Sequence, residues 1–419
     1  MQTKVIEIFK TLSKIPRCSF HADKMYEYLQ SEAKSYGYTV EVDSAKNILC
    51  SKKGSKITLQ AHYDMVCIGE APILELYEEI ENEKTWLKAK NSTLGADNGI
   101  AIAMMVLLMQ EGEAVDVLFT SDEEVGLIGA RELALELKKN LLLNLDSEEE
   151  AIVTLGCAGG VDVKVNFPIT RTSKIGKSKT ISYHDEKYLG GHSGVDIHLD
   201  IPNVLKDVAM KHQNSELVNI SGGERRNSIA KRAEVEIYHD TNSNDNKEQI
   251  DVITQSKVIF EMINGYKHGV YSFNSELNIV QTSANLAMVK SYHDSVDIDI
   301  TIRSMDNEEL VHLLDETIHY FENFGAVVTS EGFYSPWTPK ENILTKLVFD
   351  ASEEVFGSKT ALGAIHAGLE CGILGEKMPN LLMASIGPDI VYPHSTREAV
   401  DINSVERVFE VVKKVLKKL

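Results

Sequence analysis

Residues 119–130, FTSDEEVGLIGA, begin with the last residue of the apolar run VDVLF and place three carboxylates just after that run ends. The apolar run predicts a buried strand, and Asp122, Glu123 and Glu124 come directly after it. Aspartate and glutamate make up 63 of the 419 residues, so about one run of three acids is expected by chance, and such runs usually mark a solvated face. The position of this run is more informative, because open α/β sheets bind their ligands at the carboxyl ends of strands.

Length and composition indicate a globular protein with two domains. The 419 residues exceed one ordinary hydrophobic core, and 43% hydrophobic with 25% charged residues is typical of a folded chain. A net charge of −20 argues against nucleic acid or an anionic membrane as a partner. The chain shows neither a signal peptide nor an apolar run of the roughly 18 residues that a membrane span needs, which favours a cytoplasmic protein.

The cysteines give a second indication of the compartment. They are odd in number, scattered and without a CxxC pair, so we expect free, mostly buried thiols in a reducing cytoplasm. These residues are Cys18, Cys50, Cys67, Cys157 and Cys371.

The pattern of expected helices and strands changes twice along the chain. Residues 1–160 alternate helix-like and strand-like segments, which predicts the first part of an α/β domain with a sheet covered on both faces. Half-exposed strands with interspersed helices predict a separate, inserted α+β domain over 161–332, and the α/β texture returns over 333–419. In detail, we expect helices near 127–138 and 247–262 and a polar surface loop over 241–248.

Further metal-type ligands stand at other strand ends or helix starts. The strand KITLQ runs into AHYDMV, which places His62 and Asp64 on one side of an extended backbone. Asp97 lies in a glycine-flanked turn that opens a helix, and Asp146 follows the strand LLLNL. Near the C-terminus the strand NLLMASIGP leads to His394.

Each of these residues also has an ordinary structural interpretation. Asp97 is placed to cap a helix, Asp146 fits turn chemistry, and Glu124 fits a solvated face. A lone histidine is more often structural than a ligand. None of these alternatives predicts the same class of ligand at successive strand ends. Two divalent ions need about four carboxylate or imidazole ligands each, one of them shared, and a base that is not a ligand, and the chain supplies this set.

The series AHYDMV, NSTLGADNGIAIA, TSDEEVGLIGA, NLDSE, GCAGG, GGHSG, RRNSIAKRA, HAGLECG and GP…HS resembles the co-catalytic zinc peptidases of the glutamate carboxypeptidase and aminoacylase superfamily. It is most similar to the aminoacyl-histidine dipeptidases (peptidase D, Xaa-His dipeptidases), and HAGLECG and LGADNGIA are specific to that branch. The motifs occur in order over nearly the whole chain. The resemblance implies a catalytic domain with a mixed sheet flanked by helices, interrupted by a ferredoxin-like α+β lid through which two copies form a homodimer.

The resemblance also implies two divalent metal ions, zinc first, with Mn²⁺ or Co²⁺ as alternatives. His62 and Asp146 would hold one ion, Glu124 and His394 the other, and Asp97 would bridge the two.

Three further residues take catalytic roles by the same resemblance. Asp64 would lie behind His62, and Glu123 would act as general base toward a water whose pKa the metal ions lower. His192 of the motif GGHSG would reach from the lid of the partner subunit to the carbonyl oxygen of the substrate.

Substrate recognition is implied at four positions. Asn227 and Arg303 match lid residues that hold the substrate carboxylate, and His366 and Glu370 of HAGLECG match pocket residues near it; each also has a structural alternative. Lys231 stands where the family has arginine, which removes a bidentate carboxylate clamp.

Together these features predict a dinuclear-metal dipeptidase that cleaves small peptides of the Xaa-His type or a broader set of dipeptides. A tripeptide aminopeptidase or an N-acyl-amino-acid amidohydrolase is the alternative on the same scaffold, because the ligand set is shared and only the pocket differs. A non-catalytic metal-binding homologue is a further alternative, against which the intact Glu123 argues.

Overall fold

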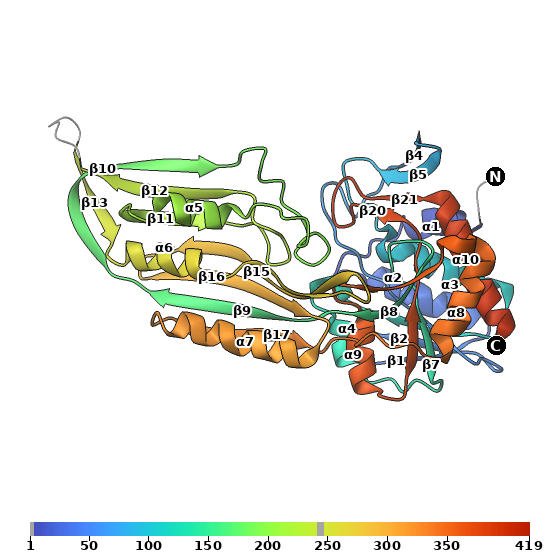
Figure 1. Cartoon of the computed structure of the whole chain (residues 1–419). Coiled ribbons are helices and arrows are strands. Elements are labelled where there is room, and N and C mark those ends of the chain that lie inside the picture. The colour runs from blue at the N-terminus through green and yellow to red at the C-terminus, as the bar shows by residue number, and fades with distance from the viewer. Residues whose placement is uncertain (1–3, 241–246) are drawn as a thin grey trace. The chain divides into compact units, whose positions relative to one another are not determined.

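The computed structural model describes residues 4–240 and 247–419, which form two compact units. Unit 1 contains the chain up to Gly156 together with Pro339–Ala364 and Leu369–Leu419, and unit 2 contains Cys157–Thr338 and Ile365–Gly368. In Figure 1 the blue and red ends of the chain belong to unit 1, and the green to light-orange middle builds unit 2. The short segment that carries His366 groups with unit 2, whereas we had expected all of 333–419 in the catalytic domain.

Unit 1 is built on an eight-stranded mixed sheet. Its strands are β1 (Thr39–Val42), β2 (Ile48–Ser51), β3 (Thr58–His62), β6 (Asp116–Thr120), β7 (Leu141–Asn144), β8 (Ile152–Cys157), β18 (Ala361–Ile365) and β19 (Leu382–Ser385). The order is β1-β2-β6-β3-β7-β19-β8-β18, and β6, β3, β7 and β19 run parallel to one another. Strands β3 and β6 are buried along their whole length, as parallel strands covered on both faces must be. The carboxyl ends of these four strands therefore meet at one edge of the sheet.

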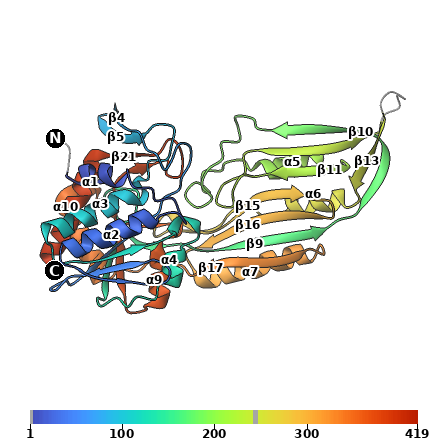
Figure 2. The same cartoon turned by 180° about the vertical axis from the view of Figure 1, so that it is seen from behind.

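Helices pack on this sheet through apolar faces. They are α1 (Lys4–Leu12), α2 (Asp23–Ser35), α3 (Ala96–Glu111), α4 (Ile128–Glu132), α8 (Ile343–Phe356), α9 (Glu370–Lys377) and α10 (Ile402–Lys418), with the short 3₁₀ helices η1 (Glu123–Val125) and η2 (Gly357–Lys359). Helix α3 is apolar on all sides and is buried against β3, α1 and α2, which Figure 2 shows beside it. Helix α10 is amphipathic and packs on α8. In the part of the chain that the structure describes, no helix is both long and apolar enough to cross a bilayer.

A small second sheet in unit 1 was not predicted. It consists of β4 (Leu76–Glu81), β5 (Lys84–Ala89), β20 (Ile390–Val391) and β21 (Ala399–Asp401), in the order β20-β21-β5-β4. Strand β4 is almost entirely exposed and β5 only half buried, so neither has the apolar alternation by which strands are predicted. The pairing of β5 with β21 joins two segments that are far apart in the sequence.

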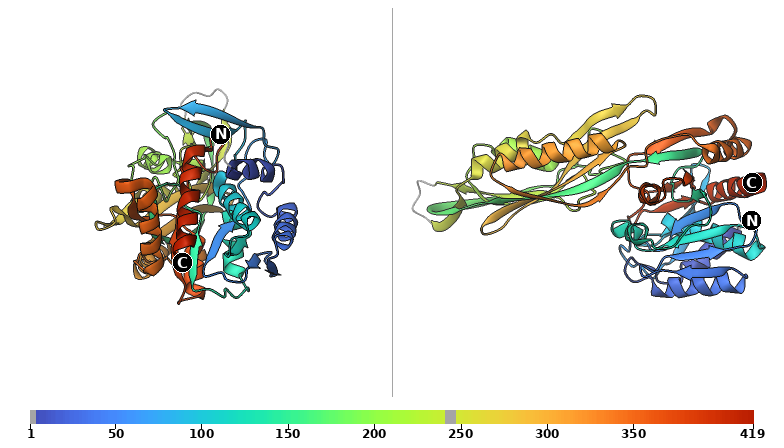
Figure 3. Two further views of the ribbon diagram at one scale, coloured as in Figure 1. Left: turned by 90° about the vertical axis from the view of Figure 1, so that its right-hand side faces the viewer. Right: turned by 90° about the horizontal axis from the view of Figure 1, so that it is seen from below.

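Among its described residues, unit 2 consists of an antiparallel sheet with three helices. Its strands are β9 (Gly159–Pro168), β10 (Arg171–Tyr183), β11 (Leu217–Gly222), β12 (Ala233–His239), β13 (Glu248–Ile253), β14 (Gly269–Asn274), β15 (Ile279–Ser291), β16 (Ser295–Ser304) and β17 (Val327–Tyr334). The helices are α5 (Val204–His212), α6 (Ser256–Gly265) and α7 (Asn307–Glu322). The path runs β13-β10-β12-β11-β15-β16-β9-β17, with β14 paired to β15. Sheet and helices share one apolar core, and Figure 3 shows the helices along one face of the sheet.

Two expected helices in these units were wrong in part. The helix expected near 127–138 is only α4, because the following backbone bonds elsewhere: Ala134 N–H donates to Asp43, and the Leu133 carbonyl accepts from Lys377. The helix expected near 247–262 begins as strand β13, which pairs with β10, and becomes helical only in α6. Most of the loop expected over 241–248 lies outside the described residues.

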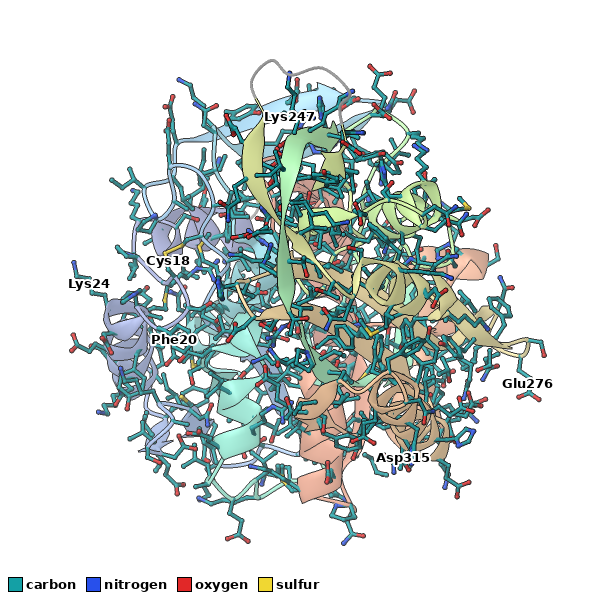
Figure 4. The ribbon with its side chains drawn as sticks, turned by 90° about the vertical axis from the view of Figure 1, so that its left-hand side faces the viewer. Cys18, Phe20, Lys24, Lys247, Glu276 and Asp315 are labelled. Carbon is teal, nitrogen blue, oxygen red and sulfur yellow. A yellow bond between two sulfur atoms is a disulfide. The ribbon has the colours of Figure 1, made fainter. Side chains whose placement is uncertain are left out.

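The prediction of five free cysteines was also wrong. Cys18 and Cys67 form a disulfide, drawn in yellow in Figure 4 beside the label of Cys18. The two residues lie 49 positions apart, and their spacing in sequence carries no signal of a pair. Cys50, Cys157 and Cys371 lie outside this disulfide and are buried, as expected.

Candidate metal centre

The five residues proposed from the sequence as metal ligands come together at the edge of the sheet in unit 1. The Nε2 atom of His62 lies 3.0 Å from Oδ1 of Asp97 and 3.3 Å from Oδ1 of Asp146. The Nε2 atom of His394 lies 3.0 Å from Oδ2 of Asp97 and 2.8 Å from Oε2 of Glu124. Asp97 thus faces one histidine with each of its carboxylate oxygens.

These contacts divide the residues into two groups that share Asp97. His62, Asp97 and Asp146 form one group, and Asp97, Glu124 and His394 form the other. Within each group one ligand atom per residue lies within 4.8 Å of the others. Glu123 belongs to neither group, although it forms a third such set with His62 and Glu124. Each of the two groups could hold a cation, with Asp97 common to both and Glu123 as a further acid beside them.

Asp64 fixes the relation between the ends of strands β3 and β6. Its Oδ1 atom lies 3.4 Å from Nδ1 of His62 and accepts the backbone N–H of Glu123 at 3.0 Å. Its Oδ2 atom accepts the N–H of Glu124 at 3.4 Å and the Ser19 hydroxyl at 2.7 Å. The carboxylate is completely buried. It therefore orients a histidine and holds the backbone of both acids that follow β6, as expected of the carboxylate behind a metal-binding histidine.

The pKa values of the cluster reflect several buried carboxylates packed around the imidazole rings of His62 and His394. Burial and the neighbouring Asp97 carboxylate raise the pKa of Glu124 to about 7. Burial also raises the pKa of Glu123 well above its usual value, assisted by Glu124 and opposed by His62. Against the effect of burial, Asp97 and Glu124 raise the pKa of His394 to about 12. Positive charge is strongly favoured at this point of the molecule.

The residues fit divalent metal ions. The buried Oε1 atom of Glu124 has no hydrogen-bond partner among the described residues, so one ligand atom is left without a partner inside the protein. Carboxylate oxygens and imidazole nitrogens are the donors that zinc and manganese accept. A cation would satisfy this atom and offset the repulsion among the buried carboxylates.

Metal addition should therefore stabilise the protein. We expect Zn²⁺ or Mn²⁺ at about 100 times its Kd to add about 2.7 kcal/mol to the free energy of unfolding of EDTA-treated protein, which raises Tm by several degrees. Differential scanning calorimetry checks this. Asp97→Asn should lose most of the shift, because Asp97 faces both histidines; an undiminished shift in that variant would place the metals elsewhere.

Comparison with known proteins adds an independent observation. A model of the peptidase family M20/M25/M40 matches residues 58–418. The chain belongs to this family. The cytosol non-specific dipeptidase of Escherichia coli K12 is 29% identical over 472 residues, which cover 99% of this chain and 97% of that protein. The aminoacylhistidine dipeptidase from Vibrio alginolyticus, a solved structure, is 28% identical with a TM-score of 0.77, over 99% of this chain and 96% of its own.

A tripeptidase from Staphylococcus aureus, 16% identical with a TM-score of 0.63, shares the fold over 100% of this chain and 99% of its own. These likenesses confirm the predicted family, the mixed α/β fold and the assignment of the chain as a metallopeptidase.

Unit 2 of this M20 peptidase holds His192 in a defined orientation. The Nδ1 atom of His192 accepts the backbone N–H groups of Gly194 and Val195 at 3.3 and 3.1 Å, and the backbone N–H of His192 donates to the carboxylate of Asp196 at 2.8 Å. A neutral imidazole that accepts at Nδ1 carries its proton on Nε2. The ring is therefore prepared as a hydrogen-bond donor through Nε2. The carbonyl of Asn227 anchors the same loop by accepting the N–H of Ser193 at 2.8 Å.

His366 and Arg303 lie in the same unit of the peptidase. The Nε2 atom of His366 lies 2.8 Å from the Ser283 hydroxyl, and burial followed by the charge of Arg303 lowers the pKa of His366 to about 3. Arg303 donates to the Tyr334 hydroxyl at 3.0 Å, while its buried Nε has no partner among the described residues. An arginine with an unsatisfied buried donor is suited to bind a carboxylate.

Glu370 is placed differently from the other proposed substrate residues. It lies in unit 1, completely buried, where its Oε2 atom accepts from the Thr120 hydroxyl at 2.6 Å and from the amide of Gln60. Gln60 in turn accepts from Asn144 at 2.6 Å. Glu370 thus belongs to a hydrogen-bond network that joins β3, β6 and β7.

Sequence reasoning missed three residues that support the proposed ligands. Asn98 donates to the carboxylate of Asp146 and to the carbonyl of Leu145. Arg17 and Glu398 hold the backbone around Asp97, as described below. Only Asn98 carried a signal, since it follows Asp97 within the motif LGADNGIA; the other two are distant in sequence from the ligands that they support.

Proposed function

We propose that this chain is a two-metal dipeptidase that hydrolyses Xaa-His-type or a broader set of dipeptides. The single observation that carries the proposal is the pair of ligand groups that share Asp97, with Glu123 beside them as an acid in neither group. The names of the two most similar proteins described above, a non-specific dipeptidase and an aminoacylhistidine dipeptidase, support the substrate class.

The chemistry follows from the residues that surround the site. Two divalent ions, zinc first, would lower the pKa of a bound water and polarise the peptide carbonyl. Glu123 takes the proton from that water as the carbonyl is attacked and returns it to the leaving amine. Burial raises the pKa of Glu123, which makes its carboxylate a stronger base. Asp64 keeps Glu123 in place by accepting its backbone N–H.

Unit 2 would act as a lid that recognises the substrate. His192 would donate through Nε2 to the carbonyl oxygen as negative charge develops there, in the active site of a partner subunit. Arg303 and Asn227 would hold the C-terminal carboxylate of the dipeptide, with His366 beside Arg303 as a neutral group. The proposed assembly is a homodimer formed through unit 2.

The remaining expectations concern partners and location. The strong negative charge supports a small peptide as substrate, with neither nucleic acid nor a membrane as partner. We propose a cytoplasmic location, in line with the name of the Escherichia coli relative. The Cys18–Cys67 disulfide is unusual for that compartment, where protein disulfides are mostly transient.

A dipeptide panel tests the proposal. Purified protein loaded with Zn²⁺ or Mn²⁺ is assayed on Ala-His, β-Ala-His, Gly-Leu, a tripeptide and an N-acetyl amino acid, with product amino acids measured by chromatography. We expect the dipeptides to be cleaved at least ~10-fold faster, by kcat/KM, than the other two substrates, because a lid that binds the C-terminal carboxylate fixes the substrate length. Preference for the tripeptide or the acylated amino acid would assign the chain to the corresponding alternative.

A further inference from the structure

The loop that presents Asp97 is held by one buried carboxylate. Both oxygens of Glu398 accept backbone N–H groups of four successive residues, 94–97. Oε2 accepts from Leu94 at 2.8 Å and Gly95 at 3.0 Å, and Oε1 accepts from Ala96 at 2.7 Å and Asp97 at 3.3 Å. Glu398 is 2% exposed, so these hydrogen bonds form away from water.

The same loop is held from its other side by Arg17. The guanidinium of Arg17, also 2% exposed, donates to the carbonyl of Gly95 and to the carbonyl of Asp64 at 2.8 Å. Gly95 thus has its N–H bound by Glu398 and its carbonyl bound by Arg17. Its backbone has a positive φ of 68°, and a methyl group there would lie 2.6 Å from the guanidinium, so a side chain at this position is excluded. The oppositely charged side chains of Arg17 and Glu398 therefore both hydrogen-bond to the same peptide segment.

Glu398 lies close in sequence to His394, one of the two histidines that Asp97 faces. It lies four residues after His394, and the next residue begins β21, where Ala399 pairs with Lys88 of β5. One short segment therefore carries both a proposed metal ligand and the group that positions Asp97. The Nε2 atom of His394 in turn lies 3.0 Å from Oδ2 of Asp97.

We propose that Glu398 is a positioning residue that sets the placement of Asp97 against both histidines and thereby the affinity of the site for its two metal ions. The inference rests on the proposed metal site. An ordinary helix cap satisfies one or two of the first amide groups of a helix. Glu398 binds two amides before α3 and two within its first turn, which locks the turn from which the Asp97 side chain leaves. A small displacement of a bridging carboxylate would change the metal affinity of both sites at once. Residues that orient metal ligands generally affect metal affinity in this way.

The test compares two buried acids of one segment. Glu398→Gln replaces one acceptor oxygen by an NH₂ group, which then faces two backbone donors. Asp401→Asn makes the same type of change in a buried acid that caps α10 through Asn403 and does not contact the loop of Asp97. Metal-free wild type and variants are titrated with Zn²⁺ and with Mn²⁺ by calorimetry, and Tm is measured on the same samples. Glu398→Asp, which keeps the charge and both acceptors, is measured as well.

We expect Glu398→Gln to weaken metal Kd by about 10- to 100-fold at both sites, and Glu398→Asp to weaken it less. Asp401→Asn should lower Tm with Kd unchanged within about twofold. Wild-type Kd values in Glu398→Gln, or in Glu398→Asp should the first variant not fold, would overturn the inference and leave Glu398 a helix cap. Wild type that binds two metals but hydrolyses no dipeptide would instead refute the proposed function and leave this inference standing.

Discussion

Glu123→Gln should lower kcat by at least ~100-fold while the protein keeps its full complement of metal. Glutamine has nearly the same shape as glutamate but cannot take a proton from water, so only the acid–base step is lost. Glu123 lies in neither of the two groups that share Asp97, and its backbone stays bound to Asp64 in the variant. Steady-state kinetics on a cleaved dipeptide and metal analysis by mass spectrometry check both halves of the prediction.

Asp122→Asn is the matched control for this variant. It makes the same acid-to-amide change one residue earlier, where the carboxylate accepts the backbone N–H of Phe20 at 2.6 Å and contacts no proposed ligand. The residue has a positive φ of 48°, which asparagine tolerates well. Its kcat should stay within about threefold of wild type, since hydrogen bonds at such exposed positions contribute little. Loss of one metal in Glu123→Gln would show that Glu123 is a ligand and that its role had been exchanged with that of Glu124.

His192→Ala should lower kcat by about 100- to 1,000-fold, the size of one oxyanion donor. The variant removes a ring whose Nδ1 atom is already occupied by two backbone N–H groups, so the lost function is donation through Nε2. Metal content should remain that of wild type, because unit 2 contributes none of the five proposed ligands. His198→Ala, an exposed histidine of the same segment, serves as control and should retain activity.

Mixing the two inactive variants tests whether the site is shared between subunits. In a heterodimer of His192→Ala and Glu123→Gln, one site combines an intact Glu123 with an intact His192 from the partner. Random exchange of subunits would restore about a quarter of the sites, since half of the dimers are mixed and each holds one good site. Recovered activity after subunit exchange, confirmed with differently tagged chains, supports the dimer. Exchange without recovery would leave His192 acting within its own chain or not at all.

The sequence by itself determined the framework of unit 1 and the identity of its proposed ligands. Apolar runs predicted β3, β6, β7 and β19 to within a few residues. Such runs are local signals, because a buried parallel strand must be apolar wherever it lies. Three of the proposed ligands, His62, Glu124 and Asp146, lie at or shortly after the ends of β3, β6 and β7, so parallel pairing brings these three to one edge.

Tertiary structure decided what depends on contacts between distant segments. Strand β13 lies where a helix was expected because it pairs with the edge of β10. Helix α4 ends early because Asp43 and Lys377 hydrogen-bond to the peptide groups that follow it. The Cys18–Cys67 disulfide joins two loops that nothing in their spacing connects.

The hold of Glu398 on residues 94–97 spans about 300 positions. The pattern of side chains along the chain indicates which residues are buried and which lie in turns. Which distant partner satisfies a backbone amide is settled only when the chain has folded, because every amide looks alike until its neighbours in space are known.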